Sequence, residues 1–170
     1  APASNRAGAQ VEAPGSRFKG FIAPSALKSG IANTGSSYAC PSVYYYPNDP
    51  THQAFHNFES SAGYMDLATA LRVSCDTVFY KFAADDWLLD GGLRQSGSYP
   101  AKATEAISNM ARKFGFGHPT GIDLPAEREG RIADRAYKLA LYKPLKPAFC
   151  KRPQPGHPGD KDAGVGAHPK

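Results

Sequence analysis

The most constraining feature of this sequence is a long apolar segment at residues 66–89, which has the periodicity of a helix. Its apolar side chains recur at spacings of three and four, so they lie along one helical face. They are Leu67, Ala70, Leu71, Val78, Phe79, Phe82 and Ala83. The polar junction at Val73-Ser74 predicts a division into two helices, and Gly91-Gly92 predicts the end of the second. The chain therefore has a largely helical core.

Further elements are expected elsewhere in the chain. Apolar periodicity and turn residues predict further helices at residues 16–29 and 103–114, strands at 40–46 and 55–58 that form a small hairpin, and a short strand-like run at 122–125. Pro24 lies inside the first of these helices, where a missing N–H favours a bend or an early end. Regular structure is expected to fade after Arg131, because prolines and glycines accumulate there.

Charge is distributed unevenly along the 170 residues. Up to Gly130 there are 11 Lys and Arg against 12 Asp and Glu, whereas from Arg131 onward there are 9 against 3, which accounts for the net charge of +5. These basic residues have no helical or strand periodicity, so we expect a solvated, disordered tail rather than a nucleic-acid surface.

No stretch approaches the ~20 apolar residues that span a bilayer, and the N-terminus lacks the features of a signal peptide.

The three cysteines, Cys40, Cys75 and Cys150, have no metal-ligand spacing. Cys40 and Cys150 lie in loop-like surroundings and are expected to pair in an oxidising compartment, whereas Cys75 lies in an apolar pattern and is expected to be a buried thiol. None of the five histidines has metal-ligand spacing with a carboxylate or a cysteine. We therefore expect neither a metal nor a cofactor.

Two short patterns carry possible chemistry. Ser16 and Lys19 are three residues apart at a predicted helix start, so a hydroxyl could lie beside an amine that accepts its proton. The ordinary alternative is a helix N-cap followed by a solvated lysine. Ser74 and Asp76 lie at the predicted junction of two helices, where both could point into a cleft; the alternative is a simple N-cap with an acidic first turn.

Three motifs, taken in order and spacing, resemble one family. They are Pro14-Gly15-Ser16-x-Phe18-Lys19, then the run from Asp66 to Tyr80 that contains Ser74-Cys75-Asp76, then Phe114-Gly115-Phe116-Gly117-x-x-Thr120-Gly121-Ile122-Asp123-Leu124-Pro125. Together they resemble the transpeptidase domain of class B penicillin-binding proteins. The likeness is to the elongation-type branch (penicillin-binding protein two) from actinobacteria, because Asp76 stands where other members carry Asn.

The resemblance implies a serine D,D-transpeptidase. Ser16 would be the acylated nucleophile, Lys19 its proton acceptor, Ser74 a proton relay to the leaving amine, and Asp76 a group that positions Lys19. The implied ligands are D-Ala-D-Ala stem peptides of peptidoglycan and β-lactams, and the implied partners are other cell-wall synthesis proteins. The implied location is the extracytoplasmic face of the bacterial membrane, with the parent protein's anchor outside this sequence.

The third family motif, Lys-Thr-Gly, does not occur in the sequence. The expected fold is therefore α+β, a partial serine-β-lactamase-like transpeptidase fold: its helical portion and a small hairpin, with most of the central antiparallel sheet missing. We expect a partial transpeptidase domain at residues 1–142, truncated before that motif, and a basic disordered tail at 143–170. Acylation is expected to be impaired. The alternatives are a non-catalytic binding or interaction module and a β-lactam-hydrolysing relative.

Overall fold

The computed structural model describes residues 10–47, 49, 51–60, 62–91, 103–123 and 125–151, the last four without their side chains. The chain divides into two compact units, Ala1–Ile132 and Ala133–Lys170. Among the described residues, no helix has both the length and the apolar character needed to cross a bilayer.

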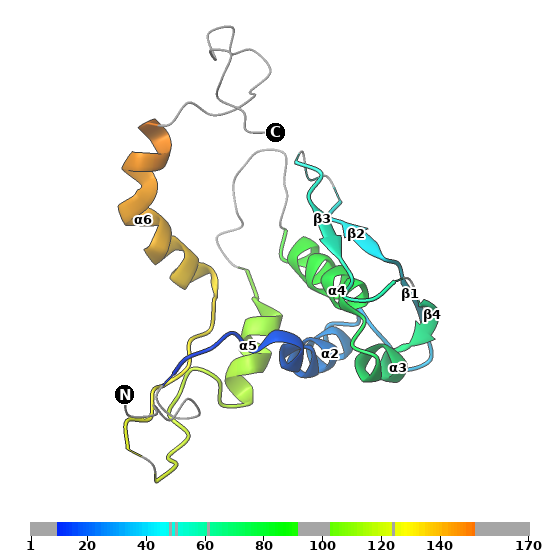
Figure 1. Ribbon diagram of the computed structural model, residues 1–170, viewed down its shortest axis with the longest axis horizontal. Coiled ribbons are helices and arrows are strands. Elements are labelled where there is room, and N and C mark those ends of the chain that lie inside the picture. The colour runs from blue at the N-terminus through cyan, green and yellow to red at the C-terminus, as the bar shows by residue number, and fades with distance from the viewer. Residues whose placement is uncertain are drawn as a thin grey trace, which may run out of the picture. The chain divides into compact units, whose positions relative to one another are not determined.

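In its described part, the first unit contains helices and four short strands (Figure 1). Its elements are η1 (Gly15–Phe18), α2 (Lys19–Lys28), β1 (Ser37–Cys40), β2 (Val43–Tyr45), β3 (Ala54–His56), β4 (Gly63–Asp66), α3 (Leu67–Arg72), α4 (Asp76–Leu89) and α5 (Ala106–Lys113). β1 pairs antiparallel with β4, and β2 pairs antiparallel with β3, so the described strands form two separate two-stranded sheets. The α+β class expected from the sequence is confirmed.

Helix α4 is the centre of this unit. It packs against α2 and α5 and also against β1, β2 and β3. Its buried side chains Phe79 and Phe82 lie in the core, and the Phe82 ring makes an edge contact with Tyr38 of β1 at 5.0 Å. Because α4 buries a continuous apolar stripe against both the helices and the strands, it holds the two kinds of element together.

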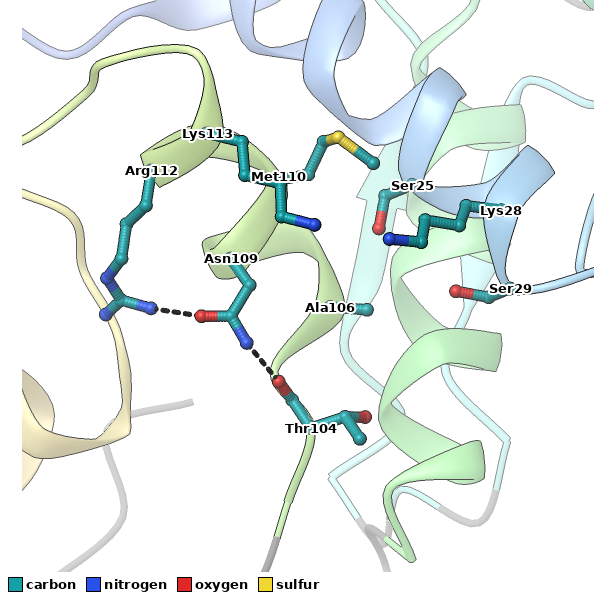
Figure 2. Close-up of a pocket in the computed structure, with 9 residues that line it drawn as sticks. All are labelled: Ser25, Lys28, Ser29, Thr104, Ala106, Asn109, Met110, Arg112 and Lys113. Carbon is teal, nitrogen blue, oxygen red and sulfur yellow. Dashed lines mark hydrogen bonds between the residues drawn. The ribbon is translucent and has the colours of Figure 1, made fainter.

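Helix α5 packs along α2, and a pocket opens between the two helices (Figure 2). Four aromatic rings join them at one end. Phe21 of α2 lies 5.1 Å from Phe114 and 4.6 Å from Phe116, and Phe18 lies 6.2 Å from Phe116, all ring centroid to ring centroid. Phe114 and Phe116 belong to the glycine-rich turn, in which Gly115 and Gly117 adopt φ of +88° and +84°. The turn therefore fastens α5 to the helix that begins at Lys19.

Several expectations about the elements hold. The apolar segment does divide, into α3 and α4, and the β2–β3 hairpin and α5 are present near their predicted positions. A bend or an early end was expected at Pro24, and the early end is wrong, because α2 runs on to Lys28. Two features explain why the helix continues. The face of α2 that carries Ala23, Ser25 and Ala26 is buried. Pro24 has no N–H to donate to the Gly20 carbonyl, but Gly20 is exposed.

The structure differs from the expected elements in three places. Strand β1 with its partner β4 forms a second sheet, and residues 122 and 123 are not part of a strand, while Leu124 lies outside the described residues. In the second unit, the expected loss of regular structure is wrong for α6 (Arg135–Lys151). Asp134 starts this helix by accepting the Tyr137 backbone N–H at 2.8 Å, and good helix formers follow. The rest of the predicted tail, residues 152–170, lies outside the described part.

Candidate functional site

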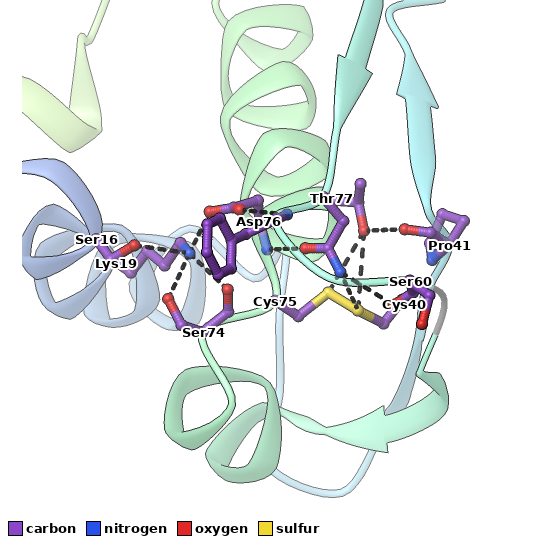
Figure 3. A network of polar contacts seen from close by, with 11 residues as sticks. Ser16, Lys19, Cys40, Pro41, Ser60, Ser74, Cys75, Asp76 and Thr77 are labelled. Carbon is purple, nitrogen blue, oxygen red and sulfur yellow. Dashed lines mark hydrogen bonds and ion pairs between the residues drawn. A yellow bond between two sulfur atoms is a disulfide. The ribbon is translucent and has the colours of Figure 1, made fainter.

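The four residues that the sequence singles out lie together around the Lys19 ammonium (Figure 3). Lys19 Nζ lies 3.2 Å from Ser16 Oγ and 2.8 Å from Ser74 Oγ, and it forms an ion pair with Asp76 Oδ1. It also donates to the Ser74 carbonyl at 2.7 Å. An ammonium has three protons and here meets four acceptors, so at least one proton is shared. Lys19 is not the solvated lysine of the ordinary alternative, because the residue is only 6% exposed.

Ser16 reaches this cluster from a 3₁₀ turn. Gly15, at φ +57°, begins the turn, which continues directly into α2, so Ser16 and Lys19 lie on one face of successive turns. No side-chain hydrogen bond caps either helix start. Ser16 is therefore not acting as an N-cap.

Ser74 has an unusual backbone. Its φ is +58°, in the left-handed region that non-glycine residues rarely adopt. Cys75 N–H bonds to the Ala70 carbonyl at 2.9 Å and Ser74 N–H to the Leu71 carbonyl at 3.2 Å, which is the Schellman pattern that ends a helix. Ser74 thus occupies the position after α3 that glycine usually fills, and the N-cap alternative is wrong, since the N-cap of α4 is Cys75. The turn aims the Ser74 hydroxyl at Lys19.

Asp76 is held from a second segment of the chain, directly after β3. The Phe58 backbone N–H donates to Asp76 Oδ2 at 3.1 Å, and the Asn57 side-chain carbonyl accepts the Asp76 backbone N–H at 2.8 Å. Asn57 therefore caps α4 from another part of the sequence. Sequence reasoning missed Asn57 and Phe58, because a cap that comes from a distant segment leaves no local spacing signal.

A disulfide joins Cys40 of β1 to Cys75, the residue between Ser74 and Asp76. The expected pairing of Cys40 with Cys150, and the expected free thiol at Cys75, are therefore wrong. The physical reason is that β1 runs beside the start of α4, which brings two buried cysteines together. Thr77 adds a second link there, because its hydroxyl donates to the Pro41 carbonyl at 2.8 Å.

A cavity of about 430 Å³ opens beside the cluster. Its lining includes Ser16, Ser74 and Asp76 together with the 57–60 segment. Phe58 is 93% exposed, so its ring is open to solvent beside this cavity. A cavity of this size is within the range of small-molecule sites, and Ser16 offers a hydroxyl to whatever occupies it. In the described part of the chain, no three His, Cys, Asp or Glu side chains are grouped to hold a metal ion.

Comparison with known proteins identifies the class that this fold and cluster define. Residues 2–144 match the penicillin binding protein transpeptidase domain, so the chain belongs to that family. Its relatives include the peptidoglycan D,D-transpeptidase MrdA of Acinetobacter baumannii, 30% identical over 142 residues, and MrdA of Escherichia coli K12, 29% identical over 143 residues. Each match covers 84% of this chain, and the chain spans about a fifth (19% and 20%) of those relatives.

Solved structures of penicillin-binding proteins align with this chain as well. Penicillin-binding protein 2 (PBP2) of Helicobacter pylori aligns with a TM-score of 0.65 at 26% identity, covering 83% of this chain and 23% of that one. PBP2 from the same organism in complex with MreC aligns with a TM-score of 0.59 at 26% identity, covering 76% and 21%. These matches confirm the class B, elongation-type assignment and the partial transpeptidase fold expected from the sequence. The actinobacterial branch stays a prediction.

Proposed function

We propose that this chain carries the nucleophile half of a peptidoglycan D,D-transpeptidase active site, with Ser16 as the acylated residue. The observation that carries the proposal is the convergence of Ser16, Ser74 and Asp76 on Lys19 Nζ. A serine needs a neighbouring base to become a useful nucleophile at neutral pH. Lys19 is the basic side chain within hydrogen-bond distance of Ser16 Oγ.

Acylation then follows in balanced steps. Lys19, as the neutral amine, accepts the Ser16 proton while Ser16 Oγ bonds to the carbonyl carbon of the D-Ala-D-Ala peptide bond. Ser74 Oγ, 2.8 Å from Lys19 Nζ, passes a proton to the nitrogen of the departing D-alanine and takes one from Lys19, whose amine becomes neutral again. The C–N bond breaks and an ester on Ser16 remains. An amine from a second stem peptide then attacks that ester and forms the cross-link, while the same proton transfers run in reverse and return the proton to Ser16 Oγ.

Asp76 has a positioning role in this scheme. Its carboxylate contacts both Lys19 Nζ and the Phe58 N–H, so it fixes the lysine against the turn that carries Ser74. The same geometry serves a β-lactam, whose strained amide carbonyl takes the place of the peptide carbonyl. In that case the leaving nitrogen stays tethered to the acyl group.

The names of the relatives support the substrate class, and the H. pylori complex with MreC supports a place beside other cell-wall synthesis proteins. We accordingly propose that the chain acts at the extracytoplasmic face of the membrane. The disulfide is consistent with that location, because such bonds persist in oxidising compartments. Since the sequence lacks Lys-Thr-Gly, we expect slow acylation by this chain.

Labelling with a fluorescent penicillin tests the proposal. The purified chain is expected to acquire one label slowly, over hours, and intact-mass and peptide analysis should locate it on Ser16. Ser16→Ala should abolish the label and Lys19→Met should reduce it at least about a hundredfold. Ser37→Ala, an exposed serine at the start of β1, is the matched control and should label as the parent does. A label that survives in Ser16→Ala, or a parent chain that acquires none, would contradict the proposal.

A further inference from the structure

A second cavity, of about 610 Å³, lies between α2 and α5, and its lining residues do not include Ser16, Lys19, Ser74 or Asp76. Three of the side chains around it are cationic and none is a carboxylate (Figure 2). The cationic residues are Lys28 from the last turn of α2, and Arg112 and Lys113 from the last turn of α5. The other lining residues are Ser25, Ser29, Thr104, Ala106, Asn109 and Met110. The cavity therefore has a positive wall.

Two of these cations face each other across the cavity. Figure 2 shows the Lys28 and Lys113 ammonium groups pointing into the same space from opposite helices. Lys28 lies so close that its hydrogen bond and its charge lower the pKa of Lys113. In the part of the chain that the structure describes, neither lysine forms an ion pair with a carboxylate. Two facing ammonium groups repel each other unless an anion lies between them.

Ser25 is an independent indication of a ligand. It is only 1% exposed, and its hydroxyl oxygen has no hydrogen-bond partner among the residues that the structure describes. Figure 2 shows this hydroxyl directed into the cavity that Lys28 also lines. A buried polar group without a partner is unfavourable by roughly 1–3 kcal/mol, so such groups usually mark a missing water, ion or ligand. Ser25 and Lys28 are three residues apart, and both therefore face α5.

The nearby helix start does not compete for this ligand. The segment that leads into α5 is already bonded to the residue that ends α4, because Asp90 accepts the backbone N–H groups of Thr104 and Glu105 at 2.7 and 2.8 Å. Asp86 likewise accepts a backbone hydrogen bond from Ile107. The donors toward the cavity include the two lysines and the Ser25 hydroxyl. A Lys–Lys pair with a hydroxyl matches a group that has two negative charges and several acceptor oxygens.

We propose that the α2–α5 cavity, formed by Lys28, Lys113 and Ser25, binds a phosphate dianion, either the free ion or the phosphate group of a small monoester. The phosphate dianion bridges the two ammonium groups and accepts a hydrogen bond from the Ser25 hydroxyl. A cavity of about 610 Å³ is larger than one phosphate needs. Ala106 and Met110 line the cavity as apolar surface for the organic part of the ligand, and Asn109 adds an amide.

Titration calorimetry with two probes tests this site, using inorganic phosphate for the free ion and glucose 6-phosphate for a small organic phosphate. We expect 1:1 binding of at least one probe at pH 7.5, with Lys28→Gln and Lys113→Gln each weakening it at least about tenfold. Ser25→Ala should weaken it less. Lys81→Gln is the matched control, because Lys81 is an exposed helical lysine paired with Asp85 on α4. Melting curves of every variant separate lost binding from lost folding.

The outcomes are distinct. Tighter binding of glucose 6-phosphate supports an organic phosphate as the ligand, and equal or tighter binding of inorganic phosphate supports the free ion. In either case phosphate should raise the pKa of Lys113, which ¹³C-lysine NMR can follow. Binding of neither probe by a folded chain, or equal binding by Lys28→Gln and Lys113→Gln, would overturn the proposal. Neither readout depends on acylation of Ser16, so the transpeptidase proposal stands or falls separately.

Discussion

At the level of single residues, the most informative position is Ser74, whose hydroxyl reaches Lys19 only because its backbone adopts φ of +58°. A left-handed conformation destabilises a non-glycine residue by roughly 1–2 kcal/mol relative to glycine. Such strain persists only where the surrounding structure enforces it. Here the Schellman turn and the adjacent disulfide do so.

We therefore predict that Ser74→Gly is more stable to unfolding than Ser74→Ala by about 1 kcal/mol. Both substitutions remove the hydroxyl, and they differ only by a Cβ atom at the strained backbone. Both should lose penicillin labelling of Ser16. Urea denaturation followed by circular dichroism measures the difference. Equal stabilities would mean that the turn relaxes out of the left-handed region when the hydroxyl is absent.

A second residue-scale prediction concerns Asp86 of α4, which is 9% exposed. Burial, and to a lesser extent the charge of Asp90, raise the pKa of Asp86 above its ordinary value. A carboxyl with a raised native pKa favours the folded state while it is protonated, and that stabilisation is lost as pH rises through the native pKa. Asp86→Asn keeps an oxygen for the Ile107 N–H and carries no charge.

Asp86→Asn should therefore be more stable than the parent at pH 7, and the difference should disappear below the unfolded pKa of about 3.9. Melting temperatures measured between pH 3 and 8 check this. Asp85→Asn is the control, because Asp85 is paired with exposed Lys81, and such surface pairs contribute about 0–1 kcal/mol. A pH-independent gap between Asp86→Asn and the parent would contradict the explanation.

At the level of elements, the Cys40–Cys75 bond joins β1 to the start of α4 across 35 residues of sequence. Closing a loop of this length is expected to stabilise the folded state by about 2–4 kcal/mol. Cys40→Ala/Cys75→Ala should lower the free energy of unfolding by that amount and slow acylation, because the turn that carries Ser74 loses its tether. Cys150→Ser is the matched control and should leave both measurements unchanged. Denaturation and labelling rates that are the same in the parent and the double variant would contradict this role.

The elements also show what the sequence could predict. The apolar spacing of residues 66–89 was sufficient for α3 and α4, and the motif spacing was sufficient for the family and for the cluster of Lys19 with Ser16, Ser74 and Asp76. Local patterns could not predict the β1–β4 pair, the Cys40–Cys75 bond or the Asn57 cap. Each of these depends on two segments far apart in the chain. The start of α6 at Asp134 did have a local signal, a capping residue before good helix formers, which the prolines at 144 and 147 obscured.

At the level of the whole molecule, the candidate site and the described core lie in the first unit, and α6 lies in the second. We predict that a chain ending at Ile132 keeps the Cys40–Cys75 bond, a cooperative melting transition and the labelling rate of the parent. Its melting temperature should lie within a few degrees of the parent value. Calorimetry and labelling check this. A broad or absent transition would show that the second unit is needed for the first to fold.

One consequence of Cys75 lying between Ser74 and Asp76 concerns biogenesis. Three cysteines permit three single bridges, namely Cys40–Cys75, Cys40–Cys150 and Cys75–Cys150. Only the first tethers the serine–aspartate turn to β1 as the structure has it. Either of the other bridges would leave that turn without its covalent link to β1. The choice of cysteine partner during oxidation of the thiols therefore decides whether this turn is tethered to β1.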